Sequence, residues 1–109
     1  MIELSDGTAG IIADRFRVLA EPMRLRLLNV LRRGELGVGA LAERVEAGQA
    51  NVSKHLQVLY QAGFVDRRKE GTTALYRIAD PTVFELCSTI CGAVEQDLKR
   101  RERTLRRHA

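Results

Sequence analysis

Residues 38–63 read VGALAERVEAGQANVSKHLQVLYQAG, and this stretch decides the fold. Its pattern predicts a short helix over residues 38–46, a break at Ala47-Gly48-Gln49, and a second helix over residues 49–62 that ends at Gly63. Two helices joined by so short a break form a helix-turn-helix, a unit that can place its second helix in the major groove of DNA.

The second of these helices has two unlike faces. At about 100° per residue, its apolar face holds Val52, Leu56, Leu59 and Gly63, and its outer face holds Ala50, Ser53, Lys54, Gln57 and Gln61. No acidic residue occurs between residues 49 and 63. Short polar groups near a helix N-terminus can contact base edges and phosphates, and the helix dipole favours phosphates. We therefore expect a recognition helix for double-stranded DNA; the alternative is an ordinary solvated helix face.

His55 lies between these two faces, about 60° from the centre of the apolar one. A histidine at this angle more often hydrogen-bonds within a helix pair than touches DNA, and we expect the former here. The other histidine of the sequence is His108.

A β-hairpin is expected directly after Gly63, because the apolar period changes from 3.6 to 2. Residues 64–69 and 73–78 are β-prone and flank the turn pair Glu70-Gly71. The side chains expected to reach phosphates or a minor groove from the hairpin tip are Arg67, Arg68, Lys69 and Thr72. The alternative is that these cations only protect an edge strand from pairing with another chain.

Three further helices complete a fold that is mainly α with one hairpin. We expect helices over about residues 8–20, from Pro22 to Arg33, and over about residues 81–106. The first and last of these carry apolar stripes, which we interpret as the seam of a homodimer. The stripe residues are Ile12, Phe16, Leu19, Val83, Cys87, Cys91, Val94 and Leu98.

Length and composition narrow the class of protein. The chain has 109 residues, so residues 1–109 are expected to form a single domain, and a dimer would add a second core. No stretch of 18 apolar residues is present, so no membrane span is expected. The first residues lack the pattern of a secretion signal, and two cysteines suit a reducing compartment, so we expect a cytoplasmic protein.

Positive charge is concentrated in two blocks of the chain. The net charge is +4, but residues 49–79 carry +3, residues 80–98 carry −4 and residues 99–109 carry +5. The middle block favours an anionic partner such as nucleic acid. The last block has two interpretations, a second contact or a solvated tail.

An enzyme is not expected, because no catalytic set or phosphate-binding glycine loop is present. A third class remains open, a protein-interaction domain of the same fold that no longer binds DNA. The basic hairpin and the acid-free helix count against it.

Several runs resemble the ArsR/SmtB family of arsenic- and metal-responsive repressors. They are VLAEPMRLRLL at residues 18–28, QANVSKHLQVL at 49–59, AGFV at 62–65, RKEG at 68–71 and LYRI at 75–78. The resemblance spans about residues 12–95. It implies a winged helix-turn-helix homodimer, joined through its first and last helices, that represses an operator and is released by an inducer. By position, Gln49, Asn51, Ser53 and Lys54 would face the operator, and Ala50 stands where a serine is usual.

The sequence departs from that family at both of its familiar metal sites. Gly37 and Gly39 stand where arsenic-binding members carry a Cys-x-Cys pair, and residues 80–98 contain no histidine, which the zinc and nickel sites of the last helix require. We therefore assign no metal site and expect no obligatory cofactor.

Cys87 and Cys91 are the only thiols of the chain and share one face of the last helix. They have two interpretations. They are either small buried hydrophobes of the seam, or a dithiol that binds an inducer such as a metalloid, a soft metal or a reactive sulfur species. Glu85, Glu95 and Asp97 are expected to raise the thiol pKa.

Overall fold

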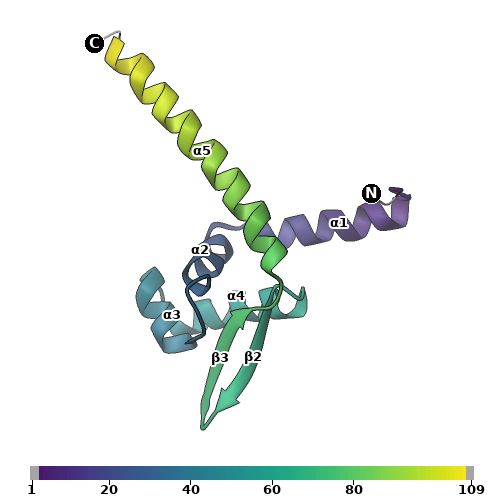
Figure 1. Cartoon of the computed structure of the whole chain (residues 1–109). Helices are drawn as coiled ribbons and strands as arrows, with labels where there is room; N and C mark the ends of the chain where they lie inside the picture. The colour runs from purple at the N-terminus through teal and green to yellow at the C-terminus, as the bar shows by residue number, and fades with distance from the viewer. Residues whose placement is uncertain (1–2, 108–109) are drawn as a thin grey trace.

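The computed structural model describes residues 3–107 and shows five helices and three strands over that range (Figure 1). The elements are α1 (Asp6–Leu19), α2 (Pro22–Leu31), β1 (Leu36–Gly37), α3 (Val38–Val45), α4 (Gln49–Gln61), β2 (Val65–Glu70), β3 (Thr73–Ile78) and α5 (Pro81–Arg107). The expected fold class, a winged helix-turn-helix with a long last helix, is confirmed. We call the β2–β3 hairpin the wing.

Two acid-proline pairs start α2 and α5. The Glu21 carboxylate accepts a hydrogen bond from the backbone N–H of Arg24 at 3.1 Å, and Pro22 takes the first helical position. The Asp80 carboxylate accepts from the backbone N–H and the hydroxyl of Thr82, and these bonds lower the pKa of Asp80. Each carboxylate satisfies an N–H group that the first turn of a helix leaves without a partner.

The wing belongs to a sheet of three strands, one more than the sequence predicts. The strand order is β1-β3-β2, and Leu36 pairs with Tyr76 while Gly37 pairs with Leu75. The expectation of a two-stranded hairpin is therefore incomplete. β1 has two residues and depends on partners about 40 positions away, so no local pattern reveals it.

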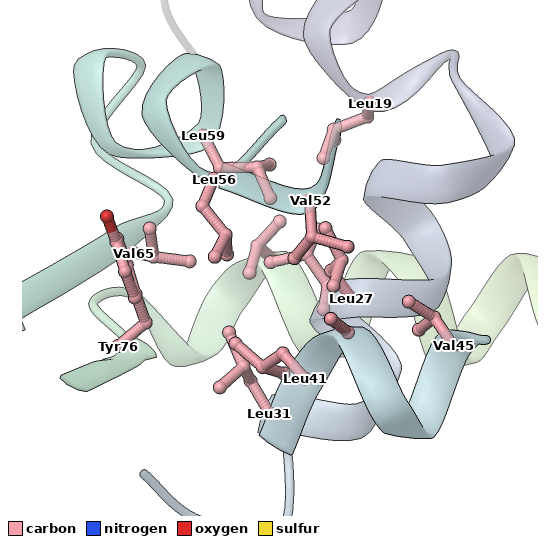
Figure 2. Packing of buried hydrophobic residues seen from close by; sticks show 13 residues of the cluster. Leu19, Leu27, Leu31, Leu41, Val45, Val52, Leu56, Leu59, Val65 and Tyr76 are labelled. Atoms are coloured by element: carbon pink, nitrogen blue, oxygen red, sulfur yellow. The ribbon is translucent and has the colours of Figure 1, made fainter. Parts of the chain in front are cut away.

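The core lies where α2, α3 and α4 meet the base of the wing (Figure 2). The predicted apolar face of α4 is correct for Val52, Leu56 and Leu59, which have no exposed surface. Gly63 is an exception, because it is exposed and adopts a φ of 83° that ends the helix. Truncating a leucine of this cluster to alanine is expected to cost about 2–5 kcal/mol.

α1 and α5 extend away from this core in different directions (Figure 1). Large apolar side chains remain exposed on both helices: Ile11, Phe16, Leu86, Ile90, Val94 and Leu98. Two of the predicted seam residues, Leu19 and Val83, are buried in the core of the protomer at 8% and 5% exposure, so they have little surface to offer a second copy. Near them, an apolar groove of about 320 Å³ runs between α1 and α5 and includes Ile12, Phe16 and Leu86.

Candidate nucleic-acid interface

The outer face of α4 presents its polar side chains to solvent. Gln49, Ala50, Asn51, Ser53 and Lys54 are all exposed in the first half of the helix. α3 ends at Val45, and the left-handed backbone of its C-cap residue Glu46 (φ 55°) turns the chain into Ala47 and Gly48. This turn starts α4 in a new direction, and its first residues, Gln49, Ala50 and Asn51, are exposed to solvent.

Two predicted DNA contacts, Gln57 and Arg67, bind each other. Arg67 donates a hydrogen bond from its guanidinium to Gln57 Oε1 at 2.9 Å. The same guanidinium carbon lies 4.1 Å from the centroid of the Tyr60 ring, within the range of a cation–π contact. Gln57 is half-buried. These contacts hold the wing against α4, a role that the sequence does not reveal.

A third predicted contact, Arg68, is engaged by two carboxylates. It donates to both oxygens of Glu35 at 2.7 and 2.9 Å and to Glu70 at 3.1 Å. The hydrogen bonds from Arg68 lower the pKa of Glu35, and the same carboxylate raises the pKa of Arg68. Arg68 therefore ties the wing to the segment before β1.

Lys54 on α4 and Lys69 and Thr72 near the wing tip are exposed. Within residues 3–107, no ion pair engages either lysine. Their ammonium groups are therefore available to an anionic partner.

His55 lies on the inner side of α4, as its angle predicts. Its Nδ1 is 3.2 Å from a guanidinium nitrogen of Arg24 and 3.7 Å from a carboxylate oxygen of Glu21, and the side chain is 16% exposed. His55 therefore contacts α2. His108 lies outside the described residues.

Gly37 fits closely against the wing. A Cβ atom built there would lie 3.1 Å from the Thr73 methyl group and 3.4 Å from Leu75. A side chain at this position would require Thr73 to shift by a few tenths of an ångström, so Gly37 suits the close packing of β1 on β3. At Gly39, the nearest atom to such a Cβ is the side-chain nitrogen of Gln49, at 3.6 Å.

Cys87 and Cys91 are free thiols in the first half of α5. Cys87 is half-buried against the core and Cys91 is exposed. Burial, and then the neighbouring Cys91, raise the pKa of Cys87. The expected direction is therefore correct, but its cause is not the nearby carboxylates. Over the described part of the chain, no cluster of three or more His, Cys, Asp or Glu side chains is placed to hold a metal ion.

The basic end of α5 lies far from the wing (Figure 1). Arg101 pairs with Asp97 at 3.0 Å, and Arg106 pairs with Glu102 at 2.8 Å, each one helical turn away. These pairs support the interpretation of a solvated helix end. None of the helices in the described range is long and apolar enough to cross a membrane.

The chain is similar to known regulatory proteins. Residues 21–67 match the family described as bacterial regulatory protein, arsR family. A probable mercury resistance operon repressor of Streptomyces lividans is 39% identical over 71 residues, which cover 65% of this chain and 57% of that protein. The match thus spans little more than half the length of that relative.

Two solved structures share the fold over nearly their whole length. The antimony-specific transcriptional repressor AntR has a TM-score of 0.80 and 32% identity, over 91% of this chain and 90% of its own. The homodimeric winged helix-turn-helix DNA-binding domain Mb0332 of Mycobacterium bovis has a TM-score of 0.77 and 32% identity, over 92% and 95%. These neighbours are regulators and not enzymes, as the sequence predicts. Together with the geometry of α4 and the wing, the similarities show that the protein belongs to the ArsR family of bacterial regulatory proteins.

Proposed function

We propose that the protein is a homodimeric transcriptional repressor that binds an operator in double-stranded DNA. The observation that carries this proposal is the exposed face of α4, which has no acidic residue. This face lies beside the wing, which carries the exposed Lys69. α4 enters the major groove, and the wing tip contacts the adjacent phosphates. Such a repressor acts in the cytoplasm.

The dimer is proposed to form through α1 and α5. Phe16, Ile90, Val94 and Leu98 are each more than half exposed in the protomer, an unusual state for side chains of this size. The Mycobacterium bovis neighbour is described as homodimeric. In a symmetric dimer the two α4 helices reach half-sites about 34 Å apart, or a multiple of that distance.

Selection of bound duplexes from random-sequence DNA tests this function directly. We expect a palindromic or near-palindromic duplex bound by two protomers, with affinity that falls steeply as salt rises. A protein that binds random and selected duplexes equally would contradict sequence-specific repression. One that binds neither would support the alternative of a protein-interaction domain.

The second part of the proposal concerns the inducer. Two relatives are named for mercury and antimony, and both elements prefer thiolate ligands. Cys87 and Cys91 supply two thiols one turn apart, between the protomer core and the exposed stripe of α5. A soft ion or a persulfide bound there would change the packing of the dimer helix. The alternative is that the thiols only fill space.

The double variant Cys87→Ser with Cys91→Ser separates these roles. It should bind the selected duplex as the wild type does and ignore mercuric ion, antimonite, arsenite, cadmium and persulfide. The wild type should lose about 5- to 150-fold in affinity with at least one of them. Equal release of both proteins, or release of neither, would show that the thiols have no sensing role. Ser88→Ala is the matched control, because Ser88 is an exposed neighbour on the same helix.

A further inference from the structure

We propose that Arg24 is a positioning residue that fixes the recognition helix α4 relative to α1, and that it acts through the unprotonated Nδ1 of His55. The inference rests on the proposed function, in which α1 belongs to the dimer seam and α4 reads DNA. This contact makes DNA binding weaker at acidic pH. Charge attraction alone would have the opposite effect, because a more positive protein binds DNA more tightly.

Arg24 joins three helices at one point. Its Nε donates a hydrogen bond to the Val18 carbonyl, in the last turn of α1, at 2.5 Å. A terminal nitrogen of the same guanidinium lies 3.2 Å from His55 Nδ1, in the middle of α4. Its backbone N–H is held by the Glu21 side chain that caps α2. A single side chain thus links the proposed dimer helix to the proposed DNA-reading helix.

The position suits an arginine for two reasons. The last carbonyl groups of a helix have no partner within it, and a cation there also offsets the negative end of the helix dipole. A guanidinium has several donors in a rigid planar fork, so it can bind the Val18 carbonyl and the imidazole together. Lysine offers a single ammonium on a flexible stem and cannot hold this geometry.

The contact with Arg24 requires one protonation state of His55. Arginine only donates, so Nδ1 must accept, and the imidazole must be neutral with its proton on Nε2. A protonated imidazole has no acceptor. Its Nδ1–H would face the Glu21 carboxylate, which is already 3.7 Å away, and its charge would repel Arg24. Protonation therefore exchanges the Arg24 contact for a Glu21 contact and releases α4 from α1.

The surroundings of the imidazole define the pH response. Within residues 3–107, the charged groups that contact it are Glu21 and Arg24, both from the start of α2. α1 contributes the Val18 carbonyl through Arg24, and Lys54 of α4 itself is on the exposed face. Histidine is the side chain that changes charge between about pH 5 and 8. A new positive charge alone would strengthen DNA binding, so weaker binding on acidification is diagnostic of the proposed contact.

The test measures affinity for the duplex selected with the wild type, at pH 8 and pH 5.5. We expect the wild type to lose about 5-fold or more on acidification. His55→Gln keeps an acceptor for Arg24 without titrating, so it should bind as the wild type does at pH 8 and show no loss at pH 5.5. Arg24→Lys should bind more weakly at pH 8 and lose the pH response. His108→Gln, which removes the only other histidine, should behave like the wild type.

Two outcomes would overturn the proposal. One is a wild type whose affinity is constant or rises on acidification, and the other is a His55→Gln variant that weakens as the wild type does. Nitrogen NMR of the free protein gives a reading that does not depend on DNA. It should show the Nε2–H tautomer of His55 at pH 8 in the wild type, and the Nδ1–H tautomer would refute the contact. If no duplex is selected, the proposed function fails, and the tautomer still decides the role of Arg24.

Discussion

The Arg67 guanidinium lies 4.1 Å from the centroid of the Tyr60 ring and also donates to Gln57, so a residue of the wing packs on α4. The two parts of the candidate interface are thus held together within one protomer. In the proposed function, these contacts hold the wing on α4 before DNA arrives, which lowers the entropy cost of binding.

Tyr60→Leu should weaken binding to the selected duplex by about 2- to 5-fold, because an exposed cation–π contact contributes about 0.5–1 kcal/mol. Tyr60→Phe is the matched control, since it keeps the ring. Fluorescence anisotropy measures both. Equal affinities for the two variants would show that the ring does not position the wing.

Lys54→Ala and Lys69→Ala should each weaken binding to the selected duplex and to a random duplex by the same factor. Each should also reduce the slope of log affinity against log salt by about 0.9, the contribution of one phosphate contact. Lys99→Ala is the control, because Lys99 lies on the part of α5 beyond the core. A salt slope unchanged by Lys54→Ala would remove that residue from the interface.

Arg68→Ala should change the salt slope less than Lys69→Ala does. Glu35 and Glu70 already neutralise this guanidinium, so little of its charge is free for a phosphate. A full loss of about 0.9 in the slope would instead mean that DNA displaces the carboxylates. The same salt titration measures both variants.

Val94→Asp should produce folded monomers. Val94 is 51% exposed in the protomer, so the charge leaves the core intact but places an unpaired carboxylate in the proposed seam. Gln96→Asp, on the opposite face of α5, should remain dimeric. Sedimentation at micromolar concentration distinguishes the two, and a dimeric Val94→Asp protein would place the seam elsewhere.

Glu46→Gly should raise the free energy of unfolding by about 0.5–1 kcal/mol. Glu46 adopts a left-handed backbone conformation that is sterically unfavourable for residues with a Cβ atom, and glycine removes this steric cost. Part of the gain is lost because glycine also raises the conformational entropy of the unfolded chain. Glu43→Gly, within α3, should lower the stability instead. Urea unfolding of both variants checks this, and a destabilised Glu46→Gly protein would contradict it.

The sequence predicts the elements well because their signals are local. Val52, Leu56 and Leu59 repeat at helical spacing, and Glu21-Pro22 marks the start of α2. What it misses depends on distant partners. β1 exists only through β3, and Leu19 and Val83 are buried because the last turn of α1 and the first turn of α5 pack against the core.

The candidate site shows the same division. The exposed face of α4 follows from the helical period, so Asn51 and Lys54 could be placed from the sequence. The partners of Arg67 and Arg68 could not, because Gln57 and Glu35 lie 10 and 33 positions away along the chain. Residues that share a basic run thus separate into wing supports and free cations only when the strands are in place.

The central claim is that α4 reads DNA sequence, and Asn51→Ala tests it most directly. The measurement is the ratio of affinities for the selected duplex and a scrambled duplex of the same composition, for wild type and variant at one salt concentration. Loss of a base contact should reduce the difference in binding free energy between the two duplexes by about 1–3 kcal/mol. The affinity for the scrambled duplex should stay almost unchanged. An unchanged ratio of affinities for the two duplexes would contradict the assignment of α4 as the recognition helix.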